Sequence, residues 1–134
     1  MKIGVVSDTH NNLKNIDRII SLFNEEEITL VVHTGDIASA SSLERFSKLD
    51  GKLVGVYGNN DRNEDGIKET AENYNFLFQE PPSLLALCQK NIAIFHEPDL
   101  IEDFLLQNQN THVVIHGHTH RYVNETRNGV LFFN

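Results

Sequence analysis

Cysteine, basic residues and long apolar runs are all scarce in this 134-residue chain. The single cysteine, Cys88, cannot pair within the chain, which argues against a disulfide-stapled scaffold and favours a cytoplasmic location. No segment approaches the roughly 18 apolar residues of a membrane span. The early apolar run, Ile3 to Val6, is too short for a signal peptide. We therefore expect a soluble protein with no membrane partner.

The charge balance is acidic. Eleven lysines and arginines against nineteen aspartates and glutamates give a net charge of −8 with neutral histidines. The basic footprint that neutralises a nucleic-acid backbone is absent, so we expect no strong binding to nucleic-acid polymers. A hydrophobic share of 40% is enough for a packed core. The length predicts one domain, residues 1–134.

Short apolar runs alternate with helical patterns in the first third of the chain, which is typical of βαβ units and a mainly parallel sheet. Strands are predicted over 2–6, 28–33 and 52–57, and helices over 12–24 and 41–49. Residues 58–82 form a weaker pattern, a loop and then a polar helix ending near Tyr74. Beyond it, strands are predicted over 84–87, 91–95 and 112–115, with a short helix around Leu100 to Leu105. Asn128-Gly129 predicts a carboxyl-terminal β-hairpin between 121–126 and 130–133.

Side chains that commonly bind metals follow the predicted strands, each where a strand ends. They are Asp8-Thr9-His10, Gly35-Asp36, Gly58-Asn59-Asn60-Asp61, His96 and Gly117-His118-Thr119-His120. In open α/β sheets functional groups gather beyond the carboxyl ends of strands, so we expect these five loops to converge. If the backbone of the two triplets is extended, both outer side chains of each face the same way. The glycines would permit tight turns that bring these side chains together.

Two carboxylates, one amide and four imidazoles form this ligand set, and it contains no thiolate. Such ligands suit Mn, Fe, Zn, Ni, Co or Mg and argue against a structural zinc site of the cysteine type. Seven ligands are too many for one ion. If Asp36 bridges, two ions about 3.5–4 Å apart could activate a water for in-line displacement.

Each motif alone has an ordinary explanation. Asp8 could cap a helix, Asp36 could be a turn residue, and His96 could be a buried, hydrogen-bonded histidine. The five motifs together, in this order, favour a dinuclear site.

The motifs resemble those of calcineurin-like metallophosphoesterases, above all the short bacterial and archaeal phosphodiesterases, and the resemblance runs from Met1 to Asn134. It implies an α/β fold, a two-sheet sandwich with flanking helices. It also implies one metal held by Asp8, His10, Asp36 and His120 and a second held by Asp36, Asn59, His96 and His118. The implied activity is hydrolysis of small phosphodiesters or phosphomonoesters by a metal-activated water. Manganese is the expected ion, with Ni, Fe, Zn, Co or Mg as alternatives.

The chain departs from the family pattern in three places. Asn60 stands where many members have a histidine that contacts phosphate or protonates the leaving group. Glu97-Pro98 replaces the usual glycine after the fourth motif and brings a negative charge towards an anionic substrate. Relatives continue past the last residue with Pro-Gly-Ser, so a truncated carboxyl end would fit. The candidate catalytic residues are Asn60, Asp61, Arg62 and Arg121, of which the two arginines directly follow ligand motifs and could donate to phosphate or be merely solvated.

The remaining features have structural explanations. The other three histidines, His33, His112 and His116, are interpreted as structural, and Cys88 as a small buried hydrophobe. Glu25, Glu26 and Glu27 predict a solvated connection from helix to strand. The apolar end, 131–133, is compatible with a strand edge that pairs in a homo-oligomer.

Two other functions stay open at this point. A protein-binding scaffold, like the retromer subunit of this superfamily, would share the fold. Such a scaffold has no need to keep metal ligands, whereas all seven positions are intact here. A nuclease of the superfamily would usually be longer, with appended domains for polymer binding.

Overall fold

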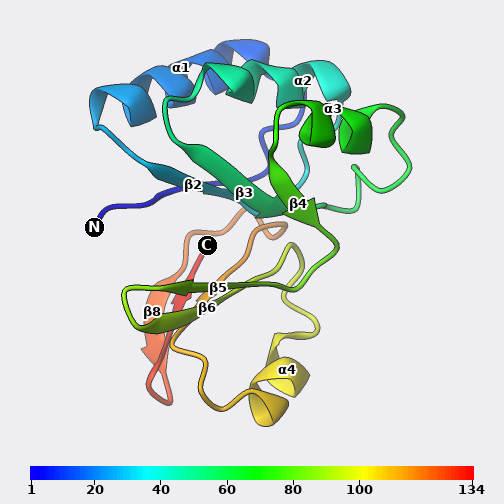
Figure 1. The fold of residues 1–134 in the computed structure, drawn as a ribbon. Coiled ribbons are helices and arrows are strands. Elements are labelled where there is room, and N and C mark those ends of the chain that lie inside the picture. The colour runs from blue at the N-terminus through cyan, green and yellow to red at the C-terminus, as the bar shows by residue number, and fades with distance from the viewer.

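The computed structural model describes residues 1–134 as two stacked β-sheets with helices on the outer face of each (Figure 1). The first sheet is parallel and has the order β1-β2-β3-β4. Its strands are β1 (Gly4–Val6), β2 (Leu30–His33), β3 (Lys52–Val56) and β4 (Leu77–Gln79). The helices α1 (Leu13–Glu25), α2 (Ala40–Arg45) and α3 (Ile67–Asn73) cover its outer face, and a short 3-10 helix, Phe46–Lys48, follows α2. The predicted α/β sandwich is confirmed.

Helix α1 forms because its apolar residues recur at helical spacing. Ile16 and Ile20 are buried against the first sheet, while Asn12 caps the helix by accepting a hydrogen bond from the Asn15 amide at 3.1 Å. At the other end, the amide of Ile28 donates to the Phe23 carbonyl at 2.9 Å. Glu27, between the two, has a left-handed φ of 53°. This is the Schellman arrangement that commonly ends helices.

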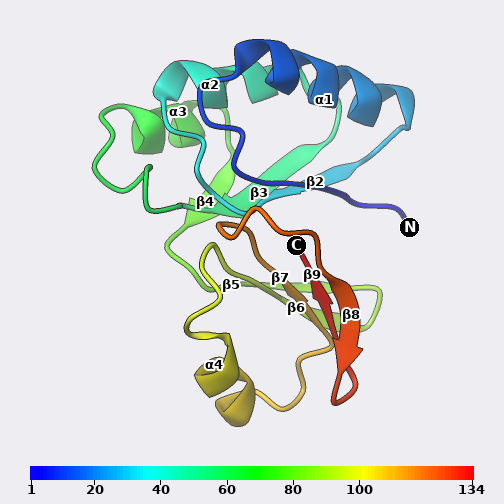
Figure 2. The same cartoon turned by 180° about the vertical axis from the view of Figure 1, so that it is seen from behind.

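The second sheet has the order β5-β6-β7-β9-β8. Its strands are β5 (Ser83–Leu87), β6 (Lys90–Ile94), β7 (Val113–Ile115), β8 (Asn124–Arg127) and β9 (Val130–Phe133). The hairpins β5-β6 and β8-β9 are antiparallel, whereas β6-β7 and β7-β9 are parallel. Helix α4 (Ile101–Gln107) lies on the outer face (Figure 2).

The core between the sheets follows from strand alternation. Leu30 and Val32 of β2 pack with Ile92 and Ile94 of β6, while Val31 faces the helices. The buried run of β2 is therefore apolar on both faces, as expected for a central parallel strand. This packing brings the carboxyl ends of strands from both sheets to one edge of the molecule.

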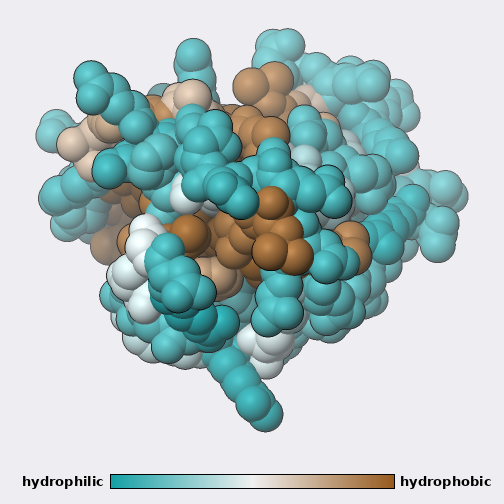
Figure 3. All heavy atoms as spheres, turned by 90° about the horizontal axis from the view of Figure 1, so that it is seen from below, coloured by the Kyte–Doolittle hydropathy of each residue, from teal (hydrophilic) through white to brown (hydrophobic).

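The outer face of the second sheet is covered only in part. Ile101 packs on Ala93, Phe95 and Phe132, and apolar side chains gather at the centre of this face (Figure 3). Beside them, a cavity of about 820 Å³ lies between α4 and the β8-β9 hairpin.

None of the four helices combines the length and apolar character needed to cross a membrane.

Three expectations from the sequence are wrong. Strand β9 lies between β7 and β8, so residues 131–133 are not a sheet edge; β8 is the edge strand. Cys88 is exposed, because it sits in the tight turn of the β5-β6 hairpin with a φ of 47°. The helix expected over 41–49 is divided into α2 and the 3-10 turn. One strand, β4, had no predicted counterpart.

Candidate metal centre

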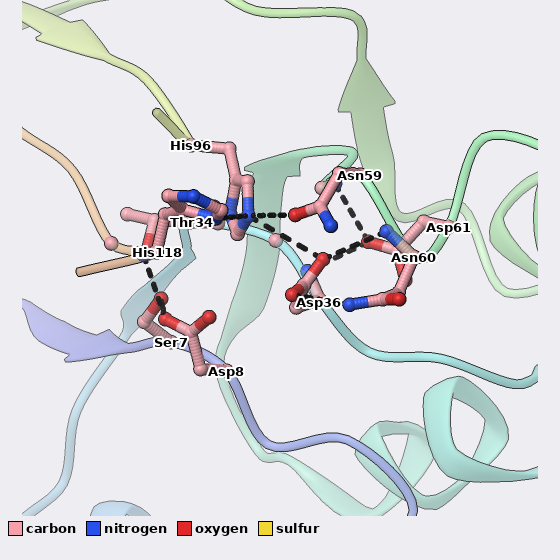
Figure 4. A network of polar contacts seen from close by, with 12 residues as sticks. Ser7, Asp8, Thr34, Asp36, Asn59, Asn60, Asp61, His96 and His118 are labelled. Atoms are coloured by element: carbon pink, nitrogen blue, oxygen red, sulfur yellow. Dashed lines mark hydrogen bonds and ion pairs between the residues drawn. The ribbon is translucent and has the colours of Figure 1, made fainter. Parts of the chain in front are cut away.

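The predicted ligands come together where strands of the two sheets end (Figure 4). The first sheet contributes Asp8, His10, Asp36 and Asn59 through the loops after β1, β2 and β3. The second contributes His96, His118 and His120 through the loops after β6 and β7. The side chains form two clusters in which potential ligand atoms lie within 4.8 Å of one another: Asp8 with His10 and His120, and Asp36 with His96 and His118.

The backbone around the ligands is left-handed rather than extended. In the first triplet φ is 49° at Asp8 and 46° at His10, and in the last triplet it is 68° at His118 and 54° at His120. The expectation that an extended backbone aligns these pairs is therefore wrong. The alternation of left-handed residues with Thr9 and Thr119 nevertheless brings both outer side chains of each triplet to the site.

Asp36 lies between the two clusters. Its Oδ1 is 3.4 Å from His96 Nε2, and its Oδ2 is 4.0 Å from His10 Nε2. On one side, His120 Nε2 is 3.3 Å from Asp8 Oδ1. On the other, His96 Nε2 lies 2.8 Å from Asn59 Oδ1 and 3.2 Å from His118 Nδ1. One carboxylate thus faces imidazoles of both groups.

The donor set fits a cation at each cluster. His96 Nδ1 lies 2.8 Å from the Thr34 carbonyl, which only accepts, so Nδ1 carries the proton and the Nε2 lone pair faces Asn59. At the other cluster, Asp8 Oδ1 is buried without any hydrogen-bond partner. A buried carboxylate oxygen without a partner is costly, and a bound cation would satisfy it.

The carboxylate of Asp8 is held in its ionised form. Burial opposes ionisation, but hydrogen bonds from the Ser7 hydroxyl and the His118 amide, together with nearby imidazoles, lower the pKa of Asp8 below its ordinary value. The Ser7 hydroxyl is thus a supporting group that the sequence motifs did not reveal. The only sign of this support in the sequence is that a serine directly precedes the first candidate ligand, Asp8.

Glycines let the loops approach closely. A Cβ on Gly58 would collide with the Asp36 carboxylate, and one on Gly117 would lie 2.7 Å from the Thr34 hydroxyl and 2.8 Å from Asp8 Oδ2. Among the three motif glycines only Gly35 has a positive φ, 104°. Close approach, more than turn geometry, therefore requires glycine at Gly58 and Gly117.

The candidate catalytic residues of the third motif both contact the Asp36 loop. Asn60 donates from its backbone amide to Asp36 Oδ1 at 3.0 Å and from its side chain to Oδ2 at 2.7 Å. The buried Asp61 carboxylate accepts four backbone amides, those of Asp36, Ile37, Ala38 and Gly58, at 2.7 to 2.8 Å. Asp61 therefore holds the loop together and has no free lone pair directed at a substrate.

The two candidate arginines and two of the remaining histidines lie outside the two ligand clusters. Arg62 pairs with Glu80 at 3.3 Å, whereas Arg121 is exposed and forms no ion pair. His112 accepts from the Asn91 amide, and His116, whose pKa is lowered by burial, bonds the Gly117 carbonyl. Neither belongs to the two clusters.

The two chain ends lie in different surroundings. Asn134 pairs through its backbone with Val123, and its side chain donates to the Thr119 hydroxyl at 2.7 Å. Met1 lies beside Cys88, in the turn that precedes β6, whereas His96 follows the other end of that strand.

Comparison with known proteins adds an independent line of evidence. The sequence profile of the calcineurin-like phosphoesterase superfamily domain matches residues 1–134. Phosphodiesterase MJ0936 of Methanocaldococcus jannaschii is 34% identical over 141 aligned positions, which cover 100% of this chain and 82% of that protein. Phosphodiesterase YfcE of Escherichia coli is 27% identical and is covered over 77% of its length by the whole of this chain.

Solved structures agree with these matches. An archaeal phosphodiesterase superposes with a TM-score of 0.90 at 32% identity, covering 100% of this chain and 82% of its own. Vps29 of Entamoeba histolytica, crystallised with zinc, superposes with a TM-score of 0.70 at 18% identity, covering 100% and 73% of the two chains. At that identity the second likeness concerns the fold alone.

Proposed function

Because the chain belongs to the calcineurin-like phosphoesterase superfamily and is a metal-dependent phosphoesterase, we propose that it hydrolyses small phosphodiesters at a dinuclear centre. The observation that carries the proposal is the position of Asp36, whose two oxygens face His96 in one cluster and His10 of the other. A carboxylate between two groups of imidazoles is suited to bridging two cations.

One ion would be held by Asp8, His10, Asp36 and His120, and the other by Asp36, Asn59, His96 and His118. Divalent ions at these positions supply Lewis acidity, which lowers the pKa of water and neutralises charge on a phosphoryl group. We propose manganese as the ion, since the ligand set of imidazoles and carboxylates without thiolate accepts it, as it does Ni, Fe, Zn, Co or Mg.

The chain's own residues orient this centre. Asn60 donates to both oxygens of Asp36, and Asp61 fixes the backbone from Asp36 to Ala38. An amide has no titratable proton to give to a departing alkoxide, so Asn60 is not a general acid. Leaving groups of low pKa are therefore favoured, which supports activated diesters as substrates.

The charge of the substrate is restricted as well as its leaving group. The net charge of −8 opposes polyanions, and Glu97 directly follows the ligand His96. Arg121, exposed and free of ion pairs beside the last ligand triplet, is the proposed donor to a phosphate oxygen. We further propose a cytoplasmic location, which suits a chain with one exposed free cysteine.

The test is hydrolysis of bis(p-nitrophenyl) phosphate by metal-stripped protein supplied with Mn, Ni, Zn or Mg singly. Asp36→Asn removes the bridging charge, and Asp103→Asn makes the same change on exposed α4 as a control. Turnover restored by metal in the wild type and in Asp103→Asn, but lost by at least about a hundredfold in Asp36→Asn, would support the proposal. Two bound ions without cleavage of any ester would favour the scaffold alternative.

A further inference from the structure

His33 lies behind the candidate metal centre without belonging to either cluster. It is the last residue of β2, and its side chain is fully buried beside the rings of Phe46 and Phe78. A buried imidazole needs partners for both ring nitrogens. Those partners come from two of the three loops that carry candidate ligands of the first sheet, the loops after β1 and β2.

The hydrogen bonds define the tautomer of His33. The Gly35 amide donates to Nδ1 at 3.0 Å, so Nδ1 carries a lone pair and the proton is on Nε2. Nε2 then donates to the Thr9 hydroxyl, also at 3.0 Å. One ring thus joins the loop after β1 to the loop after β2.

Both bonds end next to ligands. Thr9 is the central residue of the first triplet, is 8% exposed, and separates Asp8 and His10, whose backbones are both left-handed. Gly35, also with a positive φ, directly precedes Asp36. Left-handed backbone at non-glycine residues persists only where surrounding contacts hold it. The amides of Asp8 and His10 already donate to the carbonyls of Gly35 and Asp36, at 3.0 and 2.9 Å, and the Thr9 hydroxyl adds a buried side-chain anchor to these backbone bonds.

We propose that His33 is a positioning residue of the metal centre, which sets the Asp8-Thr9-His10 loop against Asp36 through the Thr9 hydroxyl and the Gly35 amide. This inference rests on the proposed dinuclear centre. Its effect should fall on ion affinity and turnover, and chiefly on the Asp8, His10 and His120 cluster, since the Thr9 bond anchors only that cluster.

The first test is Thr9→Val, which removes the hydroxyl while keeping the shape. Thr111→Val is the matched control, because Thr111 is also 8% exposed and its hydroxyl is also hydrogen-bonded, to the Asn108 carbonyl far from the ligands. Calorimetric titration of the metal-free chains with Mn²⁺ should show one binding event weakened about tenfold in Thr9→Val only. Thr9→Ser, which retains the hydroxyl, should bind as the wild type does.

Two substitutions of His33 separate its two bonds. His33→Asn keeps an acceptor near the position of Nδ1 and loses the donor to Thr9, so it should reproduce the selective loss seen in Thr9→Val. His33→Gln keeps a donor near the position of Nε2 and loses the acceptor for Gly35, so it should instead weaken both events through Asp36. Thermal unfolding of the metal-free variants shows which of them fold.

The outcomes separate the two proposals. Wild-type protein that binds no Mn²⁺ would overturn the dinuclear centre and this inference with it. Wild-type protein that binds two ions, with Thr9→Val binding both equally well and turning over bis(p-nitrophenyl) phosphate at the same kcat, would overturn the role of His33 alone. Equal losses in Thr9→Val and Thr111→Val would also contradict it, because they would indicate general destabilisation.

Discussion

Individual residues at this centre adopt unfavourable backbone conformations, which direct their side chains towards one another. Five of the seven candidate ligands have a left-handed backbone: Asp8, His10, Asp36, His118 and His120. Each such residue costs of order 1 kcal/mol. Aspartate tolerates this conformation better than most residues, and histidine is also enriched in it. The cost is offset by supporting hydrogen bonds, and those bonds are where substitutions should have their largest effects.

Asp61 is the clearest of these supports. Asp61→Asn replaces an oxygen that accepts two backbone amides with an NH₂ group, which cannot accept them. The free energy of unfolding should fall by about 2–3 kcal/mol, because buried amides lose their partners. Turnover should fall as well, since two of the four amides belong to Asp36 and Gly58.

Chemical denaturation and the pH profile of kcat check this prediction together. A positioning role leaves the profile unshifted while lowering its height. A titration step that disappears in Asp61→Asn would instead identify Asp61 as a catalytic acid or base.

His33 makes stability depend on pH. Burial lowers its pKa from the ordinary 6.5 to about 3. The unfolded chain therefore takes up a proton at this residue below pH 6.5, whereas the folded chain does so only near pH 3. The free energy of unfolding should accordingly fall as the pH decreases through this window.

The comparison that isolates His33 uses His33→Gln, which cannot titrate. Urea unfolding of the metal-free proteins at about pH 7 and about pH 5 should show a smaller loss in the variant than in the wild type. His116, whose pKa is shifted in the same direction, is present in both proteins and cancels. Equal losses would refute the assignment.

The sequence singles out the candidate ligands that the structure brings together, but not the groups that support them. Asp, Asn and His at the ends of predicted strands could be singled out because metals require those residue types. Thr34 is an ordinary strand-end residue whose carbonyl meets His96 only because the two sheets stack. Ser7 bonds the adjacent Asp8, a local contact that no metal-ligand motif includes. The bond from His33 to Thr9 joins residues 24 positions apart, which no local pattern reveals.

At the scale of elements, the end of α1 offers a direct test of backbone strain. Glu27 is exposed and left-handed in the Schellman arrangement, a position that usually holds glycine. Glu27→Gly should therefore raise the free energy of unfolding by about 0.5–1 kcal/mol. Glu26→Gly, one residue earlier with an ordinary φ of −81°, should lower it. Denaturant unfolding of both variants measures the two changes, provided that the dependence of the unfolding free energy on denaturant concentration is the same in both. Equal changes in the unfolding free energy would contradict the strain argument.

Element prediction succeeded where periodicity was strong. The pattern from Leu13 to Phe23 indicated α1 within a residue or two of its ends, and Asn128-Gly129 indicated the β8-β9 hairpin. Strand β4 was missed because it has only three residues, of which the outer two are exposed, Leu77 at 67%, so that it forms no apolar run. Its place depends on pairing with β3, a tertiary effect.

At the scale of the whole molecule, the centre joins two sheets that otherwise meet mainly through apolar packing. Ions bound to ligands from both sheets should stabilise the folded state by about 2.7 kcal/mol per site at a concentration of 100 times the dissociation constant. The midpoint temperature of thermal unfolding should rise when Mn²⁺ is added and return to its original value when a chelator is added. The shift should be much smaller in Asp36→Asn, and an equal shift there would mean that the ions bind elsewhere.

The different surroundings of the two chain ends bear on how the protein should be produced. A polyhistidine tag joined after Asn134 would place extra imidazoles beside Thr119, between two proposed ligands. Such a tag could bind ions itself and inflate the metal content. Met1 lies against the turn at the opposite end of β6 from His96. A purification tag belongs at the amino terminus, and it should be cleaved before ions are counted.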